Sequence, residues 1–217
     1  MDQNKIDFIN LLKTSGALSI KPVRLTSGHS SNWMVNTGKF STAKLIYELA
    51  GHYANTIVDN FSVGDYTKLF GPSYKGTFIV ATTAMRLYEK YHGELCEDCG
   101  YGGPNIDFDM PFFSDRKEAK CHGEGTGQKM EFLGYGPEEG DKFLILDDVA
   151  AHLTTKRKWI EELGEENVAG IVFAVNREDE EDGVKCLEKF QDDFPDVRIA
   201  YIVDKTDIEE VLSVQLH

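Results

Sequence analysis

Apolar residues recur at helical spacing near the start of the chain. In residues 3–13, Ile6, Ile9 and Leu12 follow one another three positions apart, and the segment 42–60 shows the same kind of pattern. Its repeated apolar positions are Leu45, Ile46, Leu49 and Tyr53. Because spacings of three and four residues place side chains on one face of a helix, both segments are predicted to be amphipathic helices.

Farther along the chain, short apolar runs alternate with segments of helical spacing. The predicted strands are 66–71, 108–115, 142–149, 168–177 and 197–204. The predicted helices are 75–91, 154–164, 183–190 and 206–213. Strands that alternate with helices of about ten residues or more indicate right-handed crossover units and a mostly parallel sheet covered on both faces. We therefore predict an α/β domain.

The alternation breaks down between residues 92 and 141. Two segments there, around the predicted strand 108–115, are rich in glycine and too long for ordinary connections. Long glycine-rich loops in compact domains are usually mobile or functional. These segments are therefore predicted to lie on the surface.

The size and charge of the chain narrow the classes of protein that fit it. With 217 residues and 41% hydrophobic content, residues 1–217 are predicted to form a single domain around one large core. Its 23 Lys and Arg residues face 37 Asp and Glu, a formal net charge of −14, which argues against a nucleic-acid groove and against binding to an anionic membrane. An anionic small molecule would bind only where the few cations are concentrated.

Neither a membrane span nor a secretory signal is predicted. No window approaches about eighteen consecutive apolar residues, the length that a spanning helix requires. The first residues, MDQNKIDFIN, lack the basic flank and apolar run of a signal peptide. We therefore expect a soluble, cytoplasmic protein.

The four cysteines, Cys96, Cys99, Cys121 and Cys186, are predicted to be thiols, because cytoplasmic domains rarely contain disulfides. Cys96 and Cys99 have the spacing of a zinc knuckle, and Cys121 or His122 could supply further ligands. A structural zinc site normally takes four ligands in two close pairs, and the sequence has only one clear pair. A reduced surface loop is the favoured interpretation, with a metal site as the alternative.

Polar groups follow two of the predicted strands. Asp147 and Asp148 end the run FLILDD, and GPSYKG (71–76) follows YTKLF. Because ligands of open α/β sheets gather at the carboxyl ends of strands, these two segments indicate one crevice. Adjacent aspartates can accept hydrogen bonds from sugar hydroxyls or hold a hydrated magnesium ion, and the following helix start can bind a phosphate. Alternatively, the aspartates merely cap that helix.

A basic segment lies in the otherwise acidic chain. SDRKEAKCHGEGTG (114–127) contains Arg116, Lys117, Lys120 and His122, and three glycines within five residues follow them. One interpretation is a solvated charged surface. The other is a flexible lid whose cations close over a pyrophosphate and exclude water.

Several of these motifs, in their order and spacing, resemble the orotate phosphoribosyltransferase family of pyrimidine biosynthesis. They are LTSGHSSNWMVNTGKFST, KLFGPSYKG, RKEAKCHGEGTG, FLILDDV and GIVFAVNRED. The resemblance covers nearly the whole chain, apart from an insertion around 92–106. It implies the type I phosphoribosyltransferase fold, with a mostly parallel central sheet flanked by helices. It also implies a hood-forming segment 1–40, a core 66–205 and a mobile lid loop 114–130.

The resemblance implies an activity as well. It is the transfer of a 5-phosphoribosyl group from phosphoribosyl pyrophosphate to orotate, which gives orotidine 5'-phosphate and pyrophosphate. Mg²⁺ would be held through the diphosphate rather than directly by the protein. The active unit would be a homodimer, and neither a nucleic acid nor a membrane is an expected partner.

Each site residue takes its expected role from the resemblance. Those implied in catalysis are Lys120, His122, Asp147 and Asp148. Those implied in substrate binding are Thr26, Met34, Val35, Tyr74, Lys75, Arg116, Lys117, Ala150, Ala151, His152, Leu153, Thr154, Thr155 and Arg177. The aspartates would bind the ribose hydroxyls, loop 150–155 the 5-phosphate, and Arg177 the orotate carboxylate. Tyr74, Lys75 and Lys117 would meet the pyrophosphate, whereas Arg116, Lys120 and His122 would reach into the partner's site.

The sequence departs from the family pattern at two places. The family's phosphate loop reads D-D-V-x-T-x-G-T, but Ala151 replaces the first threonine and Leu153 the glycine, although leucine resists the positive φ that glycine allows. Thr26 replaces a lysine, and an aromatic pair is lost at positions 34 and 35. These departures leave an alternative open: a phosphoribosyltransferase-fold protein that acts on another base, or a binding or regulatory relative with weak turnover.

Overall fold

The computed structural model describes residues 2–24, 30–92, 109–116 and 131–214. At its centre is a six-stranded sheet in the order β10-β7-β6-β3-β4-β5. The strands are β3 (Lys68–Phe70), β4 (Phe112–Arg116), β5 (Glu131–Gly134), β6 (Phe143–Ala150), β7 (Val168–Asn176) and β10 (Arg198–Asp204). All neighbouring strands are parallel except β4 and β5. The predicted α/β class with a mostly parallel sheet is confirmed.

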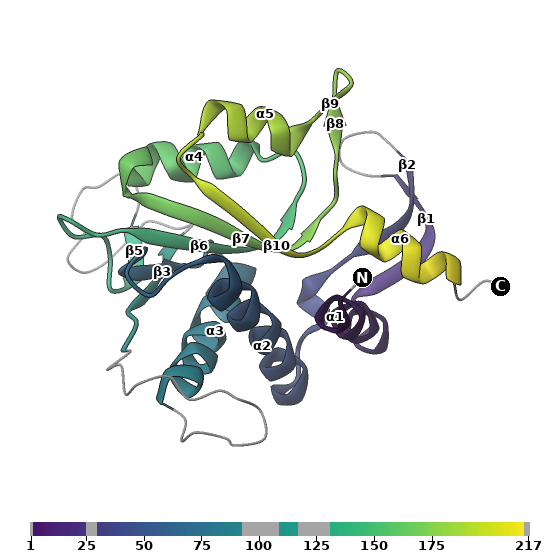
Figure 1. Cartoon of the computed structure of the whole chain (residues 1–217), viewed down its shortest axis with the longest axis horizontal. Helices are drawn as coiled ribbons and strands as arrows, with labels where there is room; N and C mark the ends of the chain where they lie inside the picture. Colours follow the sequence, from purple (N-terminus) through teal and green to yellow (C-terminus); the bar gives the residue numbers. More distant parts are fainter. Residues whose placement is uncertain (1, 25–29, 93–108, 117–130, 215–217) are drawn as a thin grey trace.

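Helices cover both faces of this sheet (Figure 1). On one face lie α2 (Ala43–Asn60) and α3 (Lys75–His92), and on the other lie α4 (Thr154–Leu163) and α5 (Cys186–Asp193). Successive side chains of a strand point to opposite faces, so β6 contributes to both cores. Leu144 and Leu146 pack with the α2 and α3 side, whereas Phe143 and Ile145 pack with the α4 and α5 side.

The amino-terminal part forms a small unit at one side of the sheet (Figure 1). It contains α1 (Gln3–Thr14) and an antiparallel hairpin of β1 (Leu18–Arg24) with β2 (Ser30–Val35), and it lies beside α6 (Lys205–Val214). Two contacts join the unit to α6. Lys5 Nζ lies 2.7 Å from Asp207, and the indole N–H of buried Trp33 donates to Glu209 at 3.2 Å. A 3₁₀ turn, η1 (Thr37–Lys39), then leads into α2.

The described elements differ from the predicted ones at several places. The hairpin β1–β2 and the edge strand β5 were not predicted. The predicted helix 183–190 starts later, at Cys186, because β8 (Glu180–Glu181) and β9 (Val184–Lys185) pair across a turn at Gly183, where φ is 77°. Strand β4 begins at Phe112 rather than at 108, and residue 108 lies outside the described residues.

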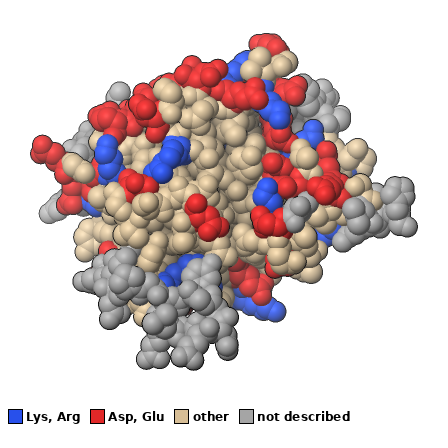
Figure 2. Space-filling model, viewed as in Figure 1, with Lys and Arg blue, Asp and Glu red and all other residues tan. Residues whose placement is uncertain are grey.

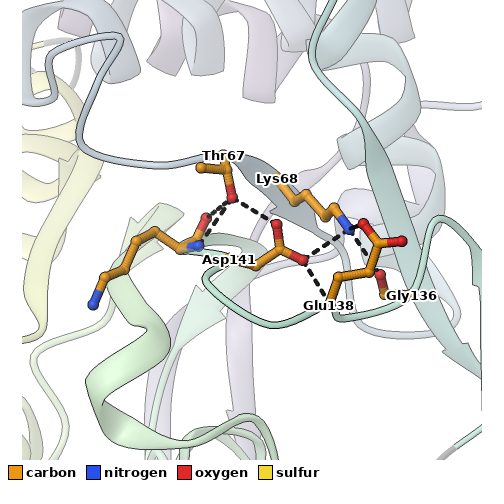
Figure 3. Close-up of polar contacts among 6 residues, drawn as sticks. Thr67, Lys68, Gly136, Glu138 and Asp141 are labelled. Atoms are coloured by element: carbon orange, nitrogen blue, oxygen red, sulfur yellow. Dashed lines mark hydrogen bonds and ion pairs between the residues drawn. The ribbon is translucent and has the colours of Figure 1, made fainter.

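An ion-pair cluster around buried Lys68 fixes the connection from β5 to β6 (Figure 3). The ammonium of Lys68, which is 5% exposed at its side chain, lies 2.8 Å from Asp141 and 2.9 Å from Glu138. Asp141 also accepts hydrogen bonds from the Thr67 hydroxyl at 2.9 Å and the Glu138 N–H at 2.7 Å. Burial raises the pKa of Asp141, but the hydrogen bonds and charge of Lys68 outweigh it, so that the pKa is lowered from its ordinary value. The cluster thereby ties β6 to the start of β3.

Acidic side chains gather along one rim of the molecule (Figure 2). Figure 2 shows Asp and Glu side chains along the rim over α5 and the β8–β9 hairpin, and a largely uncharged centre on the same face. Exposed acids of these elements are Glu180, Glu181, Asp182, Glu188, Asp192 and Asp193. Within the part of the chain that the structure describes, no helix has the length and apolar character needed to cross a bilayer.

Candidate functional site

The turn between β3 and α3 depends on two glycines that pack against each other. A Cβ at Gly71 would lie 2.2 Å from the carbonyl oxygen of Gly76, and a Cβ at Gly76 would lie 2.7 Å from the carbonyl carbon of Gly71. The Ser73 N–H donates to Asp115 Oδ1 at 2.5 Å, which ties the turn to β4. This tight turn starts α3 at Lys75 and places its ammonium at the carboxyl end of the sheet.

Asp147 and Asp148 lie near the carboxyl end of β6, which continues to Ala150, and their side chains point to opposite faces of the sheet. The Asp147 carboxylate lies on the α4 side, with Oδ2 2.5 Å from Lys156 Nζ. The Asp148 carboxylate lies on the α3 side, with Oδ2 2.7 Å from Lys75 Nζ. This arrangement follows from the two-residue period of a strand. The aspartates therefore have different partners and different environments.

Asp148 is held as a carboxylate in a hydrogen-bonded setting. Its Oδ2 accepts a hydrogen bond from the Thr37 hydroxyl at 2.9 Å as well as from Lys75, and its Oδ1 accepts one from the Val149 N–H at 2.9 Å. Burial raises the pKa of Asp148, but Lys75 and Thr37 outweigh burial and lower the pKa below its ordinary value. Its side chain is 16% exposed, so it can still accept a hydrogen bond from a ligand.

Asp147 is more deeply buried, with 8% of its side chain exposed. Burial raises the pKa of its carboxyl above the ordinary value, although the charge of Lys156 works in the opposite direction. On the other side of the strand, the buried Tyr53 hydroxyl donates to the backbone oxygen of Asp147 at 2.7 Å. This segment of β6 is thus fixed from both layers of helices.

The loop after β6 takes the left-handed backbone conformation that glycine usually supplies. Leu153 has φ 60° and ψ 3°, and its side chain is 3% exposed within the core on the α4 side. Burial of this side chain offsets the cost of a positive φ. The sequence pattern alone did not indicate that a leucine could take this conformation. The loop therefore reaches this geometry without glycine.

This loop delivers the chain to the start of α4. The Lys156 N–H donates to the Leu153 oxygen at 3.0 Å, so the N–H groups of Thr154 and Thr155 precede the first intrahelical hydrogen bond. No side chain caps the helix at Leu153. Such a helix start attracts anions, because its N–H groups and the helix dipole are both directed at the ligand.

A second polar group lies beside the same loop, at the end of β7. The Arg177 N–H donates to the Ala150 oxygen at 3.0 Å, and the Arg177 guanidinium lies 2.8 and 3.0 Å from the two carboxylate oxygens of Asp179. His152 Nε2 lies 3.9 Å from Asp179, and its Nδ1 lies 3.8 Å from Cys186 Sγ. Burial, together with the negative charge of Asp179, raises the pKa of the Cys186 thiol, which therefore stays protonated at neutral pH.

Two pockets adjoin these elements. One of about 430 Å³ is largely apolar and includes Thr37, Lys75 and Phe78 in its lining, so it lies next to Asp148. The other, of about 550 Å³, is lined in part by Tyr74 and Arg116. Within residues 2–24, 30–92, 109–116 and 131–214, no three His, Cys, Asp or Glu side chains are grouped so as to hold a metal ion.

The structure brings together many residues of the predicted site. Lys75, Asp147, Asp148 and Ala150 to Thr155 meet at the carboxyl ends of β3 and β6, and Arg177 is joined to them through Ala150. Met34 and Val35 end β2, just before Thr37. The residues that lie outside the described part are Thr26, Lys117, Lys120 and His122, together with Cys96, Cys99 and Cys121.

Sequence reasoning did not name Thr37, Lys156 or Asp179 as site residues. Thr37 lies 111 residues from Asp148 along the chain, and Lys156 lies on the helix that follows the loop after Asp147. Each meets its aspartate only in the folded chain. Lys156 is one of three basic residues in the run TTKRK at the start of α4, so its charge alone did not set it apart. For Thr37 and Asp179, the sequence offered no distinct signal.

Comparison with known proteins gives consistent relatives, although no family model matches the chain. An orotate phosphoribosyltransferase of Pseudomonas putida is 33% identical over 210 residues, which are 95% of this chain and 87% of the relative. One from Clostridium botulinum is 31% identical over 215 residues, with 98% and 87% covered. The crystal structure of the Francisella tularensis orotate phosphoribosyltransferase superposes with a TM-score of 0.74 at 27% identity, covering 99% of this chain and 90% of that one.

Proposed function

The chain belongs to the orotate phosphoribosyltransferase family, and from this premise we propose how its residues carry out phosphoribosyl transfer. The reaction moves the 5-phosphoribosyl group of phosphoribosyl pyrophosphate to orotate and forms orotidine 5'-phosphate and pyrophosphate. One observation carries the proposal: the Asp148 carboxylate, the Lys75 ammonium and the start of α4 gather at one end of the sheet. These three groups match the three parts of the donor, namely the ribose, the diphosphate and the 5-phosphate.

Asp148 acts on the ribose. Departure of pyrophosphate from the anomeric carbon builds positive charge on the sugar ring, and a nearby fixed carboxylate favours that charge. Its lowered pKa keeps it ionised at neutral pH. Asp148 can also accept a hydrogen bond from a ribose hydroxyl, which places the ring for attack by the base.

Lys75 serves the leaving group. Its ammonium now pairs with Asp148 at 2.7 Å, and its side chain is half exposed, so it can turn to an arriving diphosphate. A cation at the departing oxygens stabilises the charge that they gain. The 5-phosphate would bind at loop 151–153 and the first turn of α4.

Arg177 is proposed to face the orotate carboxylate. Its guanidinium is preorganised by Asp179, and its backbone N–H is bound to the Ala150 oxygen. The side chain therefore projects beside loop 151–153, here called the donor loop. A guanidinium fork suits a planar carboxylate, which can accept two parallel hydrogen bonds. Positioning the base and the donor together supplies much of the rate, on the order of 7 kcal/mol or more in effective molarity.

Magnesium fits this site as a companion of the donor. Mg²⁺ usually keeps several waters and binds substrate phosphates with few protein ligands. The described residues fit that mode, since Asp148 already has three protein partners and the described residues form no multidentate cage there. When bound, the metal would neutralise charge on the diphosphate.

We propose a homodimer in which α3 faces a second copy. Phe78, Met85 and Tyr88 are 66%, 65% and 50% exposed, and their spacing of seven and three residues puts them on one side of the helix. Large exposed apolar patches usually mark interfaces. Arg116 would then act across the interface, on the partner's site.

We also propose a cytoplasmic location. Cys186 is a free thiol in the described part of the chain, and domains of this size in oxidising compartments more often pair their cysteines. Cell fractionation with an antibody to the protein tests it, and recovery in a secreted fraction would contradict it.

Loss of orotate absorbance in the presence of magnesium and phosphoribosyl pyrophosphate tests the activity. We expect turnover by the wild type and a loss of about 100-fold or more for Asp148→Asn, since removal of one electrostatic group of an active site costs that much. Asp59→Asn, an exposed change on α2, is the matched control and should behave as the wild type. Pyrophosphate release with a different base but not with orotate would reassign the substrate.

A further inference from the structure

Lys156 carries a charge at a position where the surroundings are mostly apolar. Its side chain is 14% exposed and reaches from the first turn of α4 to Asp147, where Nζ lies 2.5 Å from Oδ2. The ammonium also lies 5.2 Å from the ring centre of Trp159 and 6.0 Å from that of Phe173. Both charged groups are therefore largely withdrawn from water.

Stability alone does not account for this pair. Withdrawal of two charges from water costs several kcal/mol per ion, and replacement of a buried ion pair by apolar side chains is often neutral or stabilising. An apolar side chain at position 156 would pack on Trp159 and Phe173, which already flank it. A role in the neighbouring site explains why both charges are present.

The pair controls the charge of Asp147. The charged and titratable groups around this residue are Lys156 on α4, Asp148 on β6, Lys75 on α3, which pairs with Asp148, and Tyr53 on α2, which bonds the Asp147 backbone. Burial and the charge of Asp148 both favour the neutral acid, whereas Lys156 and, as a smaller contribution, a backbone hydrogen bond from Asp148 favour the carboxylate. Without that ammonium, Asp147 would hold its proton to higher pH.

The pair also closes the donor loop. Asp147 stands before loop 151–153 and Lys156 stands after it, so their contact joins the two ends of the loop. Leu153, at φ 60°, anchors the middle of the loop through its buried side chain. Together these contacts fix the first turn of α4 relative to β6.

We propose that Lys156 is a positioning residue for the phosphoribosyl donor: it keeps Asp147 as a charged acceptor and holds the loop and helix start that receive the 5-phosphate. This role deepens the proposed function and rests on it. Lys156 acts through Asp147 and the loop, and it makes no bond to the reacting atoms.

Lys156→Met tests the role, because methionine keeps an unbranched apolar stem against Trp159 and Phe173 and removes the charge. By calorimetric titration, we expect the Kd for phosphoribosyl pyrophosphate to rise about tenfold or more, the effect of one lost charge-assisted interaction. The KM for orotate should stay within about twofold. The acid limb of kcat/KM for the donor should move to higher pH, and Lys156→Arg should restore most of the binding.

Lys158→Met is the matched control on the same helix, since Lys158 is 68% exposed and pairs with Glu162 at 3.5 Å. It should bind the donor as the wild type does. Urea unfolding of every variant shows whether it is folded. If Lys156→Met does not fold, the double variant Asp147→Asn with Lys156→Met removes both buried charges and takes its place, and it should also lose donor affinity.

Three outcomes separate the claims. A folded Lys156→Met or double variant with wild-type donor affinity and pH profile overturns the role of Lys156. Equal rises in the KM for the donor and for orotate also overturn it, because they indicate general damage. A wild type that binds the donor but never consumes orotate contradicts the proposed function, while donor binding still tests Lys156.

Discussion

At Leu153, the energetic cost of a positive φ opposes the stabilisation from a buried side chain, and two substitutions separate these two contributions. Its φ of 60° costs a residue with a side chain about 1–2 kcal/mol and costs glycine almost nothing. Its side chain is 3% exposed, and removal of a buried leucine costs about 2–5 kcal/mol. Leu153→Ala removes the packing and retains the unfavourable φ, whereas Leu153→Gly removes both.

Both variants should be less stable than the wild type, with Leu153→Gly the more stable of the two by about 1 kcal/mol. This order is the reverse of that within an ordinary helix, where glycine is less stable than alanine by about 1 kcal/mol. Ile160 is the control, since it lies in the interior of α4 and is 0% exposed in the same core. There, Ile160→Ala should be more stable than Ile160→Gly.

Urea unfolding followed by the fluorescence of Trp33 and Trp159 measures these differences by linear extrapolation. With a slope of about 1–3 kcal/mol per molar urea, a difference of about 1 kcal/mol moves the midpoint by roughly 0.3–1 M. A Leu153→Ala variant that is as stable as Leu153→Gly, or more stable, would refute the balance of packing and left-handed backbone described for the loop. Equal slopes for all variants are required for the comparison.

Three further predictions concern other parts of the chain. Lys68→Met should destabilise the fold by about 2–3 kcal/mol in urea unfolding, because Asp141 keeps two hydrogen bonds but loses its buried cation. Lys44→Met is the control at an exposed ion pair and should cost about 0.5 kcal/mol or less. Because Lys68 lowers the pKa of Asp141, this ion pair stabilises the fold fully above the ordinary Asp pKa of 3.8, and the stabilisation is lost as the pH falls through the pKa of the folded state. Lys68→Met should therefore also make the loss of stability at acid pH less steep. An unchanged loss of stability at acid pH would contradict this. In steady-state assays, Arg177→Met should raise the KM for orotate by about tenfold or more and leave the KM for the donor unchanged. Equal changes in the two KM values would contradict a contact between Arg177 and the base. Phe78→Glu should convert a dimer to monomers in sedimentation equilibrium, and an unaffected dimer would exclude this face of α3 as the interface.

The sequence pattern predicted the central sheet well because its strands are buried on both faces. FLIL and GIVFAV are continuous apolar runs, the pattern expected of parallel strands. The edge strand β5 has only four residues, EFLG, and lacks such a run. The hairpin β1–β2 contains Pro22, which argues against a regular strand, and the pairing register is irregular between Ile20 and Val23. Short edge strands were therefore missed, because the prediction relied on continuous runs of apolar residues.

The candidate site was predictable as far as it depends on strand ends. Lys75 follows β3 and Asp148 lies near the carboxyl end of the neighbouring strand β6, and their side chains meet at 2.7 Å. Side chains alternate along β6, so Asp147 pairs with Lys156 on the α4 side while Asp148 pairs with Lys75 on the α3 side. Thr37 reaches Asp148 from 111 residues away, a contact that no local pattern specifies.

Phosphorus NMR of the wild-type protein with magnesium, phosphoribosyl pyrophosphate and orotate tests the central claim most directly. The account predicts that the donor signals decline while those of a nucleoside 5'-monophosphate and of pyrophosphate grow in equal amounts, and only when orotate is present. Donor signals that persist with orotate, from a folded protein that binds the donor, would contradict it.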